Sequence, residues 1–183
     1  MSPVCNPSAA TRLPLPGPVA ILLLPFLLAA CAAFGEAPQR PCPQAVAVPD
    51  ANELVRFGGP GRDLTDVLFE ARIEDIGLVC EYDGNVVEAS LRLRILAVHG
   101  PADAGRQANF RYFVAIVTRD QRIVAREEFG LKIPFPGNRT RVAAVEELAP
   151  RIPLRPGQSG ADYLIYVGLD VTADELRYNR ENR

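Results

Sequence analysis

The chain has 183 residues, of which 48% are hydrophobic and 23% are charged. This composition is typical of a globular protein and excludes a largely disordered chain. The 20 basic and 22 acidic residues give a formal net charge of −2, so the chain lacks the basic excess that most nucleic-acid-binding proteins carry.

The first 30 residues have the three parts of a secretory signal peptide. Arg12 is the one charged side chain among them, residues 19–30 form an apolar core, and small or flexible residues precede Cys31. A membrane-spanning helix fits less well, because the apolar run is shorter than the roughly 20 residues that cross a bilayer and contains Pro25. We therefore expect residues 1–30 to be removed on export.

The end of this segment, Leu28-Ala29-Ala30-Cys31, resembles the lipobox of bacterial type II signal peptides. The resemblance implies that the Cys31 thiol receives diacylglycerol, that the chain is cut just before it, and that the new N-terminus is acylated. Two or more acyl chains anchor a protein stably, whereas one binds marginally. By the family's sorting pattern, Ala32 in place of Asp points to the outer rather than the inner membrane. The alternative is cleavage by an ordinary signal peptidase, with Cys31 as a bystander.

Residues 31–44 are predicted to form the lipidated cysteine and a tether, and residues 45–183 a single domain facing the periplasm. Three prolines keep the tether extended, so it reaches at most about 40–45 Å. Two cysteines remain beyond Cys31, and disulfides persist in exported proteins. We expect Cys42 and Cys80 to be bonded; the alternative is a buried free thiol at Cys80.

A β-hairpin is the clearest element of the domain. The stretch Tyr82-Asp83-Gly84-Asn85 separates two alternating runs and predicts strands over 67–81 and 86–98. Pairing outward from this turn, with one extra residue at 74–75, keeps every pair on one face apolar, which predicts a β-bulge there. The predicted pairs are Cys80–Val87, Leu78–Ala89, Ile76–Leu91, Ile73–Leu93, Ala71–Ile95 and Phe69–Ala97.

Further strands are predicted over 45–48, 110–118, 123–133 and 163–171, of which 110–118 is apolar on both faces and therefore central. The segment Thr140–Leu154 is compatible with a strand or a helix, and we favour a strand because prolines interrupt it. The capping box from Thr172 to Glu175 predicts a short terminal helix toward Tyr178. About seven strands predict an all-β fold, a sandwich of immunoglobulin or fibronectin-III-like kind.

The mature chain is also similar to uncharacterised envelope lipoproteins of Gram-negative bacteria. The similar features are a start that contains Cys42-Pro43, the stretch over 61–66 and the stretch over 133–140. This resemblance implies a place in the envelope and no particular activity.

Residues that catalysis needs are scarce. His99, the one histidine, ends a predicted strand and is expected at the surface, while Ser90 and Ser159 lie in no nucleophile-elbow motif. The glycine-rich stretch 58–63 lacks the Gly-Lys-Ser/Thr of a phosphate loop and reads as a wide turn with Asp63, Thr65 or Asp66 accepting from its backbone. We predict no catalytic residues, no metal site, no cofactor and no enzymatic activity.

Charge is distributed unevenly along the domain. Residues 45–104 hold 5 basic and 11 acidic residues, whereas residues 105–141 hold 8 basic and 3 acidic ones. If the basic side chains gather on one sheet, they would suit lipid phosphates or an acidic partner. The alternative, which we favour, is that each points to water from its own strand. The candidate residues are Arg111, Arg119, Arg122, Arg126, Arg139 and Arg141.

Three functional hypotheses follow. The first is a non-catalytic interaction or envelope-assembly module that binds an envelope protein and no nucleic acid. The second is a small-ligand or glycan-binding module, which requires an apolar pocket between the sheets. The third is a hydrolase, which requires His99 close to Ser90, Ser159 or a carboxylate cluster.

Overall fold

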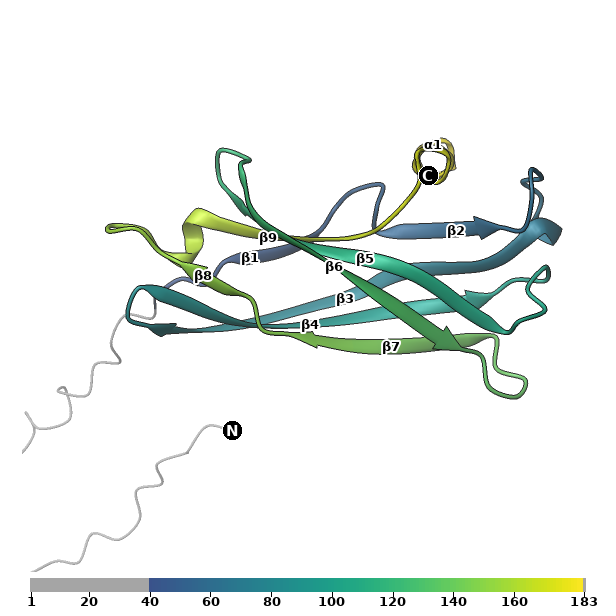
Figure 1. The fold of residues 1–183 in the computed structure, drawn as a ribbon, viewed down its shortest axis with the longest axis horizontal. Coiled ribbons are helices and arrows are strands. Elements are labelled where there is room, and N and C mark those ends of the chain that lie inside the picture. Colours follow the sequence, from purple (N-terminus) through teal and green to yellow (C-terminus); the bar gives the residue numbers. More distant parts are fainter. Residues whose placement is uncertain (1–39, 183) are drawn as a thin grey trace, which may run out of the picture. The chain divides into compact units, whose positions relative to one another are not determined.

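A computed structural model describes residues 40–182 of the chain (Figure 1). Over this range the chain forms two β-sheets that pack face to face, followed by a short helix. The predicted all-β sandwich with a C-terminal helix is therefore confirmed. The predicted signal peptide, Cys31 and the tether as far as Gln39 lie outside the described residues.

Sheet A has four strands in the order β1-β9-β5-β6, with bounds Gln44–Ala47, Tyr163–Leu169, Gln107–Thr118 and Ile123–Pro134. Sheet B has β2, β3, β4 and β7 side by side, with β8 pairing with β4; the bounds are Glu53–Phe57, Val67–Asp83, Val86–His99, Arg141–Leu148 and Arg151–Pro153. Only β1 and β9 pair in parallel. Helix α1 spans Ala173–Glu181, and two 3₁₀ turns lie at Leu64–Asp66 and Gly160–Asp162.

The described residues contain nine strands, where about seven were expected. Strand β2 was not predicted, and it is defined by its pairing with β3. The segment 140–154 is extended, as favoured, but forms two strands. It divides at Ala149-Pro150, and both β7 and β8 pair with β4.

The β3–β4 hairpin confirms the predicted bulge but not the predicted register. Its register shifts between Ile73 and Asp75, as expected. Cys80, however, pairs with Ala89 rather than Val87, because Gly84-Asn85 forms the turn. Gly84 has a φ of 56° at the first central position, where type II′ turns carry glycine. Each partner moves by two residues, so the same apolar face still points inward.

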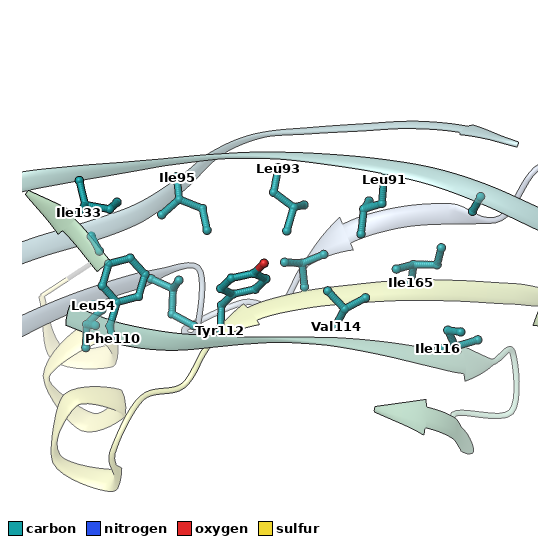
Figure 2. Packing of buried hydrophobic residues seen from close by; sticks show 14 of the residues in the cluster. Leu54, Leu91, Leu93, Ile95, Phe110, Tyr112, Val114, Ile116, Ile133 and Ile165 are labelled. Atoms are coloured by element: carbon teal, nitrogen blue, oxygen red, sulfur yellow. The ribbon is translucent and has the colours of Figure 1, made fainter. Parts of the chain in front are cut away.

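The core lies between the inner faces of the two sheets. Leu91, Leu93 and Ile95 of β4 point toward β5, whose Tyr112 and Val114 point back at them (Figure 2). The three β4 side chains are at most 1% exposed. Burying a leucine or isoleucine side chain contributes about 1.5–3 kcal/mol, so this contact holds the two sheets together.

Strand β5 is central, as predicted, because it lies between β9 and β6. Its inner face belongs to the core, and its outer face carries Phe113, Ala115 and Val117. Phe113 lies over Gly168 of β9, where a Cβ atom would come within 2.6 Å of the ring.

The chain enters the sandwich at the turn of the β3–β4 hairpin. The predicted disulfide is present: Cys42 is bonded to Cys80 of β3. The Tyr82 hydroxyl donates to the Pro41 carbonyl and accepts from the Gly160 amide at 2.7 Å, while the Arg40 guanidinium lies 3.7 Å from the Tyr82 ring centroid. These contacts fix the chain from Arg40 onward to the body of the domain.

Helix α1 begins at the predicted capping box. The Thr172 side chain accepts from the Glu175 amide, and the Glu175 carboxylate accepts from the Thr172 amide. The other Glu175 oxygen lies 2.7 Å from Arg56 of β2. Asn179 donates to the backbone carbonyls of Asp50 and Glu53, so the helix is attached along β2.

Candidate functional site

The four edges of the two sheets are protected very differently. An edge strand exposes unpaired N–H and C=O groups, which another strand can recognise. On one side, β1 has four residues and follows Pro41 and Pro43, while β2 carries helix α1 (Figure 1). On the other side, among the described residues, β6 is twelve residues long and pairs only with β5, and β7 is eight residues long and pairs only with β4. No helix packs on β6 in the described part of the chain.

The first half of β6 is also uncovered on its inner face. Ala125 and Glu127 pair with Ile116 and Val114, whose side chains belong to the core, so both point between the sheets. Residues 123–128 are nevertheless all exposed. By contrast, the second half packs normally, and Ile133 is 2% exposed. The sandwich is therefore closed at one end of β6 and open at the other.

A groove occupies the open part, between β6 and the β7–β8 edge. Its inner section has a volume of about 370 Å³ and is lined by Val114 and Ile116 of β5, Phe129 of β6, and Leu148 and Pro150 opposite. A second section of about 400 Å³ continues past Val124 and Leu154 toward the β5–β6 turn. We call the two sections together the open groove.

Two carboxylates point between the sheets here: Glu127 lines the groove, and Glu146 lies two residues before the lining residue Leu148. Glu127 comes from β6; Glu146 comes from β7, where it pairs with the inward-facing Leu93. The Tyr112 hydroxyl donates to Oε2 of Glu146 at 3.0 Å, and Phe129 stacks on the Tyr112 ring at 5.1 Å. Burial, the hydrogen bond and the negative charge of Glu146 together raise the pKa of Tyr112 above its usual value.

No cation neutralises these carboxylates among residues 40–182. The Glu127 side chain has no hydrogen bond or ion pair there, and Tyr112 is the one hydrogen-bond partner of the Glu146 side chain. Three of the four arginines that line the groove are paired with other carboxylates: Arg126 lies 3.1 Å from Glu128, Arg151 lies 2.8 Å from Glu88, and Arg122 lies 3.2 Å from Asp120. The fourth, Arg155, has no ion pair with a described residue. The open groove is therefore apolar on its floor, its rim carries four arginines, and Glu127 is the lining carboxylate that has no ionic partner among the described residues.

The six arginines proposed as an anionic-partner patch do not lie together. Arg119 and Arg122 are in the β5–β6 turn, whereas Arg139 and Arg141 lie beyond the opposite end of β6. The twelve-residue β6 separates these pairs by about 40 Å. Arg111 and Arg126 project from the outer face of sheet A, and both contact Glu128. The favoured alternative, separate solvated arginines, describes them better.

His99 is not the surface residue that was expected. Its side chain is 13% exposed, its Nε2 lies 2.9 Å from the Asp103 carbonyl oxygen, and its ring meets Phe135 edge-on. The structure does not bring it near either serine. Ser90 lies nine residues away along β4, or about 30 Å, and Ser159 lies in the loop before β9. His99 instead fixes the loop that follows β4.

The glycine-rich stretch forms the turn that its sequence predicted. The stretch 58–63 is a turn in which the Asp66 carboxylate accepts from the Asp63 amide at 3.1 Å, as anticipated. Between Arg40 and Asn182 there is no group of three or more potential metal ligands. The same range contains no helix that is long and apolar enough to cross a membrane.

The outer faces of the two sheets differ in character. Sheet B carries charged side chains outward, among them Glu70, Arg72, Glu88 and Arg92, whereas sheet A presents an apolar surface next to β1. A shallow hollow of about 460 Å³ lies on this surface. Its apolar lining residues are Val48, Phe113, Ala115, Val117, Ile123 and Tyr166.

The sequence contains a signal for the groove that strand prediction alone did not use. Glu127 and Glu146 each occupy an inward position in an otherwise apolar alternation. An acidic residue at such a position indicates an inner face that is not fully covered, because a fully buried, unpaired carboxylate is costly.

The sequence matches no protein-family model, and no curated protein is similar to it in sequence. A search of solved structures finds similarity to the variable (V) domain of the AgI/II polypeptide BspA from Streptococcus agalactiae. The identity is 12% over 64% of this chain and 72% of that chain, with a TM-score of 0.21. No conclusion about the fold or the function is drawn from a similarity at this level, and the fold is defined by the strand pairing described above.

Proposed function

We propose that this protein is a lipid-anchored lipoprotein of the bacterial envelope whose β-sandwich is a non-catalytic interaction module. The observation that supports the module is the open groove. One side of the sandwich is closed by α1 and by a short strand that follows prolines, while the other leaves a long edge strand and an apolar groove accessible. Such a surface is typical of a binding site rather than of a self-contained fold.

The anchor is supported by the lipobox at Cys31 and by the way the chain joins the domain. Because contacts hold the chain from Arg40 onward, eight residues remain between Cys31 and Arg40. Eight fully extended residues span at most about 30 Å, which is less than the reach of the whole tether. The lipid would hold the hairpin end of the domain close to the bilayer, with the outer membrane as the expected location.

A small ligand or a glycan fits the open groove less well than a segment of a protein. Its volume falls within the range of ligand sites, but such sites bury most of the ligand's surface. Here residues 123–128 are exposed on both faces, so a small molecule would stay largely in water.

The anchor is tested with Cys31→Ala in the full-length chain. We expect loss of fatty-acid labelling and release of the protein from the membrane fraction, with the wild-type protein in the outer-membrane fraction. Cys5→Ala is the matched control, because Cys5 leaves with the signal peptide and its replacement should change nothing. Unchanged labelling of the Cys31→Ala protein would contradict the anchor.

The binding role is tested by photo-cross-linking in the native envelope. A photoreactive residue at Val124, which is 50% exposed at the groove, should give a discrete cross-linked product. The same residue at Val79, which is 68% exposed on the outer face of sheet B, is the control. Equal products at both positions, or none at either, would count against a binding groove.

A further inference from the structure

Building on the proposed binding role, we propose that the open groove receives an extended segment of a partner protein. This segment pairs with the free edge of β6. At the position opposite Glu127 it has a lysine or arginine, whose side chain points between the sheets, as those of Glu127 and Glu146 do. Three properties of the groove lead to this partner: its free edge, its apolar floor and its unneutralised carboxylates.

The free edge determines that the partner is extended. Backbone N–H and C=O groups along one side of β6 have no partner strand among the described residues, whereas those on the other side pair with β5. An incoming strand satisfies these groups with main-chain hydrogen bonds, which is how sheet edges commonly capture peptides. The exposed part of β6, residues 123–128, accommodates a segment of six to eight residues.

The apolar floor of the groove determines which side chains the partner segment has at its inward positions. In an added strand every second side chain points into the groove. There the positions opposite Ala125 and Phe129 face apolar atoms of Val114, Ile116 and Leu148. Apolar side chains therefore fit at these two positions, which lie on either side of the one opposite Glu127.

The two inward carboxylates determine the charge of the partner segment at its central inward position. A strand that covers the groove removes water from Glu127 and Glu146, and an uncompensated carboxylate away from water is costly. Tyr112 satisfies only one oxygen of Glu146, and Glu127 has no partner among the described side chains. A basic side chain at the central inward position offsets this cost, whereas a neutral or acidic one does not.

The same charges disfavour several of the registers in which a second copy of this chain could pair with β6. Antiparallel pairing of two β6 strands centred on residue 127 or 128 places that glutamate opposite itself. Centring the pair on residue 129 places Arg126 opposite Lys132. Like charges directly opposite each other destabilise a pair of strands, so these three registers are unfavourable, whereas pairs centred on residue 125 or 130 oppose no like charges.

The experiment uses the full-length chain in detergent and a library of seven-residue peptides. Each peptide has threonine at positions one, three, five and seven, and a randomised residue at positions two, four and six. We expect selection to enrich apolar residues at the outer two positions and lysine or arginine at position four. Amide exchange of residues 123–128 should slow when an enriched peptide is bound.

A charge reversal makes the test specific. For Glu127→Lys, selection should switch to aspartate or glutamate at position four, and affinity for the lysine peptide should fall by about five- to tenfold. Glu147→Lys is the matched control, because Glu147 lies on the outer face of β7 and should leave the selection unchanged. Glu127→Gln, which keeps the shape of the side chain, should weaken the basic preference without reversing it.

Three results would overturn the proposal: no basic enrichment, a preference unaffected by Glu127→Lys, or protection of amides outside β6. If Glu127→Ala makes the chain dimerise while peptides show no charge preference, the carboxylate only prevents self-association. The Val124 cross-link separates this failure from that of the binding role. A product at Val124 without a basic preference rejects the partner chemistry alone, whereas no product rejects the groove as a binding site.

Discussion

The hydrogen bond between Tyr112 and Glu146 joins the floor of the groove to its edge, and removing it should give a distinctive result. Tyr112→Phe deletes the donor but keeps the ring, which stacks on Phe129. Hydrogen bonds to charged groups contribute about 1.5–3 kcal/mol. Because Glu146 is only half-buried and water can replace part of the bond, we expect a loss of about 1.5 kcal/mol in the free energy of unfolding.

The sign of this effect should depend on residue 146. In a Glu146→Ala background the Tyr112 hydroxyl is buried without its acceptor, so removing it should cost nothing or stabilise the protein. Urea denaturation of the wild type, the two single variants and the double variant measures this coupling. Tyr166→Phe is a control, because the Tyr166 hydroxyl on the outer face of sheet A has no hydrogen bond to a described residue.

Because of this bond and the burial of Tyr112, the free energy of unfolding should also fall at alkaline pH. The pKa of Tyr112 is raised above the ordinary tyrosine value of 10.0, first by burial and then by Glu146. The native state thus keeps a proton that the unfolded chain loses near pH 10. The contribution of Tyr112 is complete below pH 10 and is lost as pH rises above it. Equal stability of the wild type and Tyr112→Phe from pH 7 to 11 would refute this reasoning.

The disulfide and the terminal helix give two further expected outcomes. The Cys42–Cys80 disulfide closes a loop with a sequence separation of 38, so its reduction should lower the free energy of unfolding by about 4 kcal/mol. Urea denaturation measures this loss, and an unchanged midpoint after reduction would contradict the expectation. Asn179→Ala removes two hydrogen bonds to the backbone beside β2 and should cost about 1–2 kcal/mol, with amide exchange accelerated mainly in α1. Persistent protection of α1 in that variant would show that other contacts hold the helix.

Much of the sandwich was predictable from local pattern. The apolar pattern identified six of the strands, as an alternation with a period of two or, for β5, as a continuous apolar run, and the break in alternation near residue 74 located the bulge. The capping box at Thr172 identified the start of α1, because its hydrogen bonds involve residues only three apart. The pairing of Cys42 with Cys80 followed from their being the two cysteines beyond Cys31.

The hairpin register and the surroundings of His99 were not predictable in the same way. An even shift of register keeps the apolar face inward, so the hydrophobic pattern cannot distinguish Val87 from Ala89 as the partner of Cys80. The backbone of Gly84 decides it. His99 lies at a strand end, which suggested exposure, but Asp103 and Phe135 from two other segments cover it.

The sequence by itself determined the type of fold, the alternation of each strand and the presence of an acidic residue at an inward position in two of them. Only the tertiary structure decided that these two strands lie at neighbouring edges, that α1 covers the opposite side, and that the arginines lie apart. The physical reason is that periodicity is a property of neighbouring residues. The spacing between two sheet edges instead depends on the twist and packing of both sheets, which many distant residues set together.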